Sequence, residues 1–295
     1  MLWSGTEALP GVVSVLQKLR KLGKQILFVT NNASKSRRLL LERFESLGIQ
    51  ASKDEVFSSA FASAAYLKDV LQFPQDRKVY VIGMKGLEEE LDAVGIQYIG
   101  GTVRLLLIQD PKENVAIEGT NFAPLLAPGV FDDSVGAVLC GIDTSLSYAK
   151  MAKAFRYLTR ENAMDDVKSG QVGGGCHFLC TNDDTTFPTK EGPWPGAGSV
   201  WAGIRDSTKR KPTIIGKPNQ PMIDTIFASR SFDKSRTIMV GDRLNTDIAF
   251  GLHGGIDTML VLTGISTEAD VHENDAPAVP TYVIQGLGEL DVLEP

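Results

Sequence analysis

Short apolar runs alternate with helical patterns in the first part of the chain. Residues 10–23 begin with proline, carry apolar side chains at helical spacing and end with glycine, which predicts a helix. Residues 26–29 are continuously apolar, as in a strand that is buried on both faces of a parallel sheet. Ser34 can cap a second predicted helix, which ends near Gly48.

The same alternation returns near the end of the chain. Apolar strands are predicted at residues 213–215, 237–240, 259–262 and 282–284, with a helix at 221–229. Strands that alternate with helices usually pair in parallel through right-handed crossovers. The two ends of the chain therefore predict one α/β domain, a doubly wound, Rossmann-like core built on a parallel sheet.

The middle of the chain departs from this rhythm. Its predicted strands lie at residues 79–82, 103–108 and 137–140, and its predicted helix at 87–93. Residues 111–134 are rich in Pro, Gly, Asn and Asp and predict a long irregular loop. We therefore expect residues 1–76 and 209–295 to form the core domain, and residues 77–208 to form a second α/β domain inserted into it.

Composition and charge exclude several classes of function. The chain has 295 residues, 43% of them hydrophobic, which allows an ample core, and its length suits one large or two modest domains. Its net charge of −6 argues against a nucleic-acid or anionic-membrane surface, because both require a basic footprint. The sequence has no run of eighteen apolar residues and no signal-peptide pattern, so we expect a cytoplasmic protein.

Three cysteines are too few and too unevenly spaced for a disulfide framework. Cys176 and Cys180 together with His177 allow a metal site, but a fourth ligand is missing. The simpler interpretation is that these are buried or surface thiols.

Polar residues stand directly after three of the predicted strands. They are Thr30, Asn31 and Asn32 after the first, Lys217 after the second and Asp242 after the third, with Asp247 five residues further on. In open α/β sheets, ligands bind beyond the carboxyl ends of the strands, so we expect these side chains to meet at one edge of a single sheet. Hydroxyl, amide and ammonium groups bind phosphoryl oxygens, and two carboxylates suit Mg²⁺.

Each of these residues also has an ordinary structural interpretation. A threonine at a strand end is often a cap or turn residue, and Lys217 lies in a Gly-Lys-Pro turn where it could be solvated. Asp242 and Asp247 could be a helix cap and part of a solvated face. The combination of all these residues at the ends of three strands favours a site.

Residues 28–34 (Phe-Val-Thr-Asn-Asn-Ala-Ser), 216–218 (Gly-Lys-Pro) and 240–248 (Val-Gly-Asp-Arg-Leu-Asn-Thr-Asp-Ile) closely resemble the second, third and fourth motifs of haloacid dehalogenase phosphatases. The likeness is closest to the subgroup typified by 4-nitrophenylphosphatase and phosphoglycolate phosphatase. Residues 180–185 (Cys-Thr-Asn-Asp-Asp-Thr) are similar to the Ala-Thr-Asn-X-Asp signature of that subgroup. The resemblance covers nearly the whole chain. The sequence departs from the family pattern at the 111–134 loop, which resembles an insertion in the cap.

The resemblance implies roles for the residues at the strand ends. Thr30 and Asn31 would hold the transferring phosphoryl group, and Lys217 would steady the phosphate and the nucleophile. Asp242 would bind Mg²⁺, and Asp247 would support the ion directly or through water. The inserted domain would be the large cap that selects the substrate.

Further residues are implied in substrate binding. These are Asn32, Asn182 and Asp184, of which Asn182 and Asp184 could equally belong to a capped turn before Pro188. The resemblance leaves the substrate open among small phosphorylated metabolites such as phosphoglycolate, aryl phosphates and pyridoxal phosphate. It also implies a possible homodimer formed through the cap.

The first motif of the family, Asp-X-Asp, does not occur among the 295 residues. In the family its first aspartate attacks phosphorus and its second serves as acid and base. The segment that would carry it lies just before Met1, so we expect a mis-set start or a shortened sequence. The alternative is a pseudo-phosphatase that binds ligands or partners without catalysis.

A nucleotide-binding α/β protein is a third class of function, and the sequence argues against it. No Gly-X-X-X-X-Gly-Lys-Ser/Thr or Gly-X-Gly-X-X-Gly motif follows a predicted strand at a helix start. Residues 170–175 are rich in glycine, but they precede a predicted strand and are interpreted as a turn.

Overall fold

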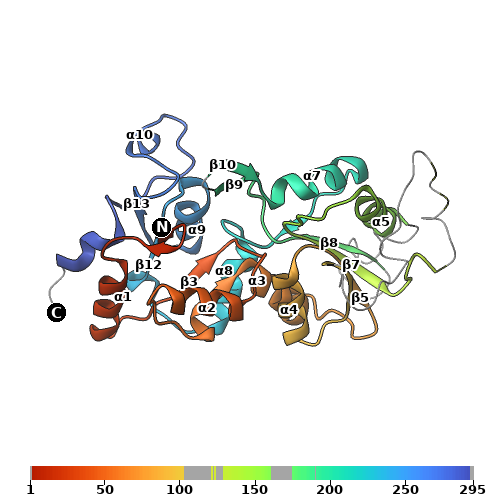
Figure 1. Cartoon of the computed structure of the whole chain (residues 1–295), viewed down its shortest axis with the longest axis horizontal. Helices are drawn as coiled ribbons and strands as arrows, with labels where there is room; N and C mark the ends of the chain where they lie inside the picture. Colours follow the sequence, from red (N-terminus) through yellow and green to blue (C-terminus); the bar gives the residue numbers. More distant parts are fainter. Residues whose placement is uncertain are drawn as a thin grey trace. The chain divides into compact units, whose positions relative to one another are not determined.

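The computed structural model of the chain (Figure 1) describes residues 2–102, 121, 123, 129–160, 175–189 and 191–292. The chain divides into two compact units. Unit 1 consists of Met1–Thr30, Arg37–Ser58 and Gly216–Pro295, and unit 2 of Asn31–Ser36 and Ser59–Ile215.

Unit 2 is built on a five-stranded parallel sheet with the order β11-β8-β7-β5-β6. Its strands are β5 (Lys78–Ile82), β6 (Tyr98–Gly100), β7 (Val135–Cys140), β8 (His177–Cys180) and β11 (Thr213–Ile214). Its helices are α3 (Ser59–Ala65), η2 (Tyr66–Val70), α4 (Lys85–Ala93), α5 (Tyr148–Thr159) and α7 (Ala197–Thr208). A separate antiparallel hairpin joins β9 (Thr186–Thr189) to β10 (Gly192–Pro195).

Helices cover both faces of this sheet, because successive side chains of a strand point to opposite faces. Tyr80 and Ile82 of β5 pack in one apolar cluster with residues of α5 and α7. Val79 and Val81 of the same strand pack in another cluster with residues of α3 and α4. Every residue of β7 is buried, as expected for a central strand in such a sheet. The α/β class predicted from the sequence is confirmed.

Unit 1 contains two parallel sheets and a short hairpin within its described residues. One sheet pairs β3 (Phe28–Thr30) with β4 (Val56–Ser58), and the other has the order β12 (Ile238–Gly241), β13 (Asp257–Val261) and β14 (Tyr282–Ile284). The hairpin joins β1 (Trp3–Ser4) to β2 (Glu7–Ala8).

The helices of unit 1 pack around these strands. They are α1 (Val12–Lys21), α2 (Arg37–Ser46), α8 (Gln220–Ser229), α9 (Ala249–Gly254) and α10 (Glu268–Val271). Short 3₁₀ helices lie at η1 (Lys53–Glu55), η4 (Lys234–Arg236) and η6 (Leu287–Val292), and a π-helix lies at η5 (Leu244–Ile248). Phe28 of β3 stacks on Phe44 of α2, with ring centroids 4.5 Å apart. Both rings belong to a cluster that also includes Val12 and Leu16 of α1 and reaches Val240 of β12.

Two sequence expectations differ from the structure. The strands that precede the predicted site residues do not share one sheet: β3 and β12 lie in separate sheets of unit 1, and β11, before Lys217, pairs with β8 in unit 2. Expected domain borders at residues 77 and 208 also differ from the compact units, because α3 packs with α4 and β11 joins the unit 2 sheet. That residues 77–208 form an inserted cap domain stays a prediction.

Other expectations lie outside the described residues. The predicted strand at 103–108 is among them, as are the glycine-rich residues 170–174 and much of the 111–134 loop. No helix in the described part of the chain is both long and apolar enough to span a bilayer.

Asp132 is expected to stabilise unit 2 in a pH-dependent way. Partial burial alone would raise the pKa of Asp132, but hydrogen bonds from Lys78 and Ser134 outweigh it and lower the pKa to about 2. Such a carboxylate stabilises the fold above its unfolded pKa of about 4, and this contribution is lost as the pH falls towards 2. The pair is about one-third exposed, so screening limits the expected cost of Asp132→Asn at pH 7 to about 1 kcal/mol.

Urea denaturation of the two proteins from pH 7 to pH 2 measures this effect. The difference in unfolding free energy between Asp132→Asn and the unmodified chain should shrink below about pH 4. A difference that stays constant over this range would contradict the assignment.

Candidate active site

Three of the predicted residues meet at the carboxyl end of β12 in unit 1. The Lys217 Nζ donates to Asp247 Oδ1 at 2.6 Å, and both side chains are more than nine-tenths buried. The other oxygen, Asp247 Oδ2, accepts the backbone N–H groups of Asp242 and Arg243 at 3.1 and 3.2 Å. Lys217, Asp242 and Asp247 therefore form one connected cluster.

Lys217 also links this cluster to β3. Its Nζ donates to the carbonyl oxygen of Val29 at 3.0 Å. Val29 is followed by Thr30, the last residue of β3, whose side chain is half-buried. Lys217 therefore contacts the residue before Thr30, although β3 and β12 lie in different sheets.

Two glycines make room for the carboxylates. A side chain at Gly241 would overlap that of Asp247, and a side chain at Gly264 would overlap that of Asp242. The loop after β13 also fixes Asp242, because the Ser266 backbone N–H donates to Asp242 O at 2.9 Å and the Ile265 N–H to Asp242 Oδ2 at 3.3 Å. The sequence analysis did not include this loop in the site. Thr263-Gly264 follows a predicted strand, so the rule that ligands bind beyond the carboxyl ends of strands could have identified it.

The other predicted residues lie in unit 2. Asp184 Oδ2 accepts from Asn31 Nδ2 at 3.0 Å and from Asn182 Nδ2 at 2.9 Å. The Asn31 carbonyl oxygen accepts the Ser59 hydroxyl at 2.7 Å, a contact that the sequence did not reveal. Asn32 is exposed, and its Oδ1 caps the next turn by accepting from the Ser34 N–H and hydroxyl at 2.9 and 2.8 Å.

The cysteines are all buried and free. Burial raises the pKa of the Cys176 thiol to about 11 and also raises the pKa of Cys180 well above its ordinary value. Protonated thiols are poor metal ligands. Within the described residues, no three His, Cys, Asp or Glu side chains are grouped so that they could hold a metal ion.

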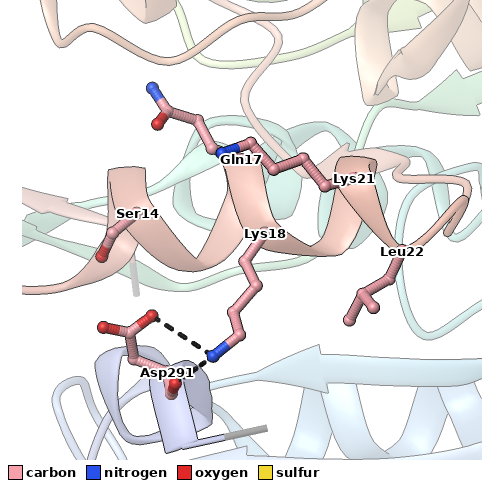
Figure 2. A pocket seen from close by; sticks show the side chains of 6 residues that line it. All are labelled: Ser14, Gln17, Lys18, Lys21, Leu22 and Asp291. Atoms are coloured by element: carbon pink, nitrogen blue, oxygen red, sulfur yellow. Dashed lines mark hydrogen bonds and ion pairs between the residues drawn. The ribbon is translucent and has the colours of Figure 1, made fainter. Parts of the chain in front are cut away.

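A surface cavity of about 430 Å³ lies elsewhere in unit 1, where α1 meets η6 (Figure 2). It is lined by Ser14, Gln17, Lys18, Lys21, Leu22 and Asp291. Lys18 reaches across it to the main-chain oxygen of Asp291. None of the predicted site residues lines this cavity.

The Lys217 cluster fits a small anion beside a hard cation. Mg²⁺ keeps several waters and is usually bound by one or two carboxylates, so the absence of a three-ligand group among the described residues does not conflict with it. Asp242 can supply such a ligand. Both oxygens of Asp247 already accept hydrogen bonds, which suits a supporting role behind Asp242.

Two family models match most of the chain. A family model described as haloacid dehalogenase-like hydrolase matches residues 1–97, and a second, described as HAD-hydrolase-like, matches residues 214–290. The second match contains Lys217, Asp242 and Asp247.

Whole-chain similarity extends to named phosphatases. The chain is 42% identical to a 4-nitrophenylphosphatase of Schizosaccharomyces pombe, over 98% of this chain and 90% of the relative. It is 38% identical to phosphoglycolate phosphatase 2 of Arabidopsis thaliana, over 98% and 89%. A crystal structure of a glycerol phosphate phosphatase from Mycobacterium tuberculosis in complex with calcium matches with a TM-score of 0.73 and 26% identity, over 98% of this chain and 71% of that one.

These similarities show that the protein is a phosphate-ester hydrolase with a mixed α/β fold, whose relatives are phosphatases. The chain belongs to the haloacid dehalogenase-like hydrolase family. The resemblance inferred from the motifs at residues 28–34, 216–218 and 240–248 is confirmed.

Proposed function

We propose that this protein has the site of a Mg²⁺-dependent phosphatase for small-molecule phosphate monoesters of the phosphoglycolate or aryl phosphate type. The observation that carries the proposal is the buried Lys217–Asp247 pair, which also binds the backbone of the partly exposed Asp242. The 4-nitrophenylphosphatase and phosphoglycolate phosphatase relatives support this substrate class, and the calcium complex of a related phosphatase supports a divalent cation.

In this proposal each group has a distinct task. The Thr30 hydroxyl and the amide groups of Asn31 donate hydrogen bonds to the phosphoryl oxygens, and the Lys217 ammonium offsets their negative charge. Asp242 holds Mg²⁺, and Asp247 keeps both Lys217 and the backbone at Asp242 in place. When bound, Mg²⁺ would neutralise charge on the phosphate.

The proposed reaction is two displacements at phosphorus. An aspartate attacks to form an aspartyl-phosphate, and water then hydrolyses it, while a second acid protonates the leaving oxygen and later activates the water. The family resemblance assigns both acids to an Asp-X-Asp motif, which these 295 residues do not contain.

Metal binding tests the proposed site without depending on turnover. In isothermal titration calorimetry with Mg²⁺ and inorganic phosphate, Asp242→Asn is expected to weaken Mg²⁺ binding by about tenfold or more, because a charged oxygen ligand is lost. Asp257→Asn removes the same charge from an exposed residue of β13 and should leave the affinity unchanged. Equal Mg²⁺ affinity in Asp242→Asn and the unmodified chain would contradict the assignment.

Two further expectations accompany the proposal. A cytoplasmic location and a homodimer formed through the cap both stay predictions, as does the absence of nucleic-acid and membrane partners.

A further inference from the structure

We propose that Asp184 is a positioning residue, which fixes the side-chain amide of Asn31 and does not itself touch the substrate. This inference rests on the proposed function, in which Asn31 helps to bind the phosphoryl group. It replaces the substrate-binding role that the resemblance implied for Asp184.

The carboxylate of Asp184 lies between two amides. One of its oxygens, Oδ2, accepts from Asn31 Nδ2 at 3.0 Å and from Asn182 Nδ2 at 2.9 Å. Hydrogen bonds to an ionised acceptor are about twice as strong as neutral ones, so this oxygen holds both amides firmly. A carboxylate beside a dianionic phosphate would also repel it, which disfavours direct contact with substrate.

The second amide anchors this arrangement in the core of unit 2. Asn182 is 5% exposed, and its Oδ1 accepts the hydroxyl of the fully buried Thr181 at 2.9 Å. The Asn182 carbonyl oxygen accepts the indole N–H of Trp201 in α7 at 3.0 Å. The hydrogen bonds from Thr181 through Asn182 to Asp184 therefore connect Asn31 to groups that have little freedom to move.

The backbone at Asp184 is fixed as well. The Gly198 N–H at the start of α7 donates to Asp184 O at 2.9 Å, and the Gly196 N–H donates to Thr185 O at 2.8 Å. A side chain at Gly196 or Gly198 would overlap the carbonyl oxygen of Asp184 or Asp183, respectively. This close approach holds the backbone that carries Asp184 against the start of α7.

Asn31 belongs to a segment, residues 31–36, that is anchored in unit 2. Ala33 is 4% exposed and packs in the cluster formed by β5, β7, α3 and α4. The Ser34 carbonyl oxygen accepts the Gly86 N–H at 3.3 Å, and the Ser36 hydroxyl donates to Glu89 at 2.5 Å.

This segment lies where parallel sheets usually bind ligands. In the unit 2 sheet, β6 and β7 lie on opposite sides of β5, and such a switch point opens a crevice at the carboxyl ends of the strands. A Cβ atom at Gly141, which follows β7, would lie 3.7 Å from Ala33 Cβ. Residues 31–36 therefore lie at the carboxyl end of β7, beside this crevice. Asn31 is thus a fixed part of unit 2, although it directly follows Thr30 of unit 1.

Two substitutions of Asp184 separate positioning from simple support of the fold. Asp184→Leu keeps the branched shape of the side chain but removes the oxygen that accepts from both amides. Asp184→Asn keeps a neutral oxygen in that place, which accepts more weakly than a carboxylate. Asp183→Asn is the matched control, because it removes the neighbouring carboxylate, whereas both amides donate to Asp184.

The first readout is hydrogen exchange at the Asn31 side-chain amide in ¹⁵N NMR, assigned with Asn31→Asp. The second is the dissociation constant of inorganic phosphate with Mg²⁺ present. Asp184→Leu should speed exchange and weaken phosphate binding by about tenfold, with Asp184→Asn intermediate and Asp183→Asn unchanged.

Unchanged exchange in Asp184→Leu would overturn the inference, and so would faster exchange with unaltered phosphate affinity. Equal effects of Asp184→Leu and Asp184→Asn would also overturn it, because they would indicate only a structural role. If the unmodified chain binds no phosphate, the proposed function fails, and the exchange readout alone then decides whether Asp184 fixes Asn31.

Discussion

A Lys217→Met substitution is expected to lower the free energy of unfolding by about 3–5 kcal/mol, because it leaves the Asp247 carboxylate buried without its ammonium partner. The two side chains are only 8% and 9% exposed and lie 2.6 Å apart. The backbone N–H groups of Asp242 and Arg243 still bind the carboxylate, which places the expected loss towards the lower end of this range. Urea denaturation at pH 7 measures the change.

A double substitution and a surface control complete this experiment. Lys217→Met combined with Asp247→Leu should be less destabilised than Lys217→Met alone, because no buried charge remains. Arg38→Met removes an exposed i,i+4 pair with Glu42 and should cost less than about 1 kcal/mol. A loss in Lys217→Met as small as that of the control would show that the Lys217–Asp247 pair is not buried as described.

The sequence predicted the elements well where apolar patterns were strong. The predicted helix at 10–23 corresponds to α1, the helix at 221–229 to α8, and the strand at 282–284 to β14. Strands buried on both faces, such as β7, have continuous apolar sequences, which distinguish them from half-exposed strands and from loops. These signals are local, so one sequence is enough to detect them.

Sheet membership could not be predicted in the same way. The strand before Lys217 resembles the other strand ends of the expected core, yet β11 pairs with β8 of unit 2. Pairing depends on which distant edge lies alongside a strand, and the pattern of residues 213–215 carries no information about this. The expectation of one shared sheet was wrong for this reason, although Lys217 and Asp247 do meet.

The motif residues were found from sequence, but their contacts were not. The family resemblance pointed to Asn31, Asn182 and Asp184 without showing that one carboxylate oxygen binds both amides. Asn31 and Asp184 are 153 positions apart, so only the folded chain brings them together. The support of Asp242 by Ser266 was missed for a different reason: the strand end at Thr263-Gly264 was not counted among the candidate site positions.

Phosphatase activity is expected to depend on a nucleophilic aspartate. A polypeptide of these 295 residues is expected to show no useful phosphatase activity, because loss of the attacking group from a catalytic unit costs on the order of 10⁴–10⁶ in rate. Extending it at the amino terminus by a strand that ends in Asp-X-Asp-Gly supplies the attacking carboxylate and the second acid together. This extension should therefore raise turnover by a similar factor.

Turnover of 4-nitrophenyl phosphate with Mg²⁺, measured side by side for the two polypeptides, tests the central claim most directly. We predict that only the extended chain hydrolyses the ester, and that its activity is lost when the first aspartate of the motif is changed to Asn or when Asp242→Asn is introduced. Comparable turnover by the 295-residue chain, abolished by Asp242→Asn, would contradict the account, since another residue of this chain would then be the nucleophile.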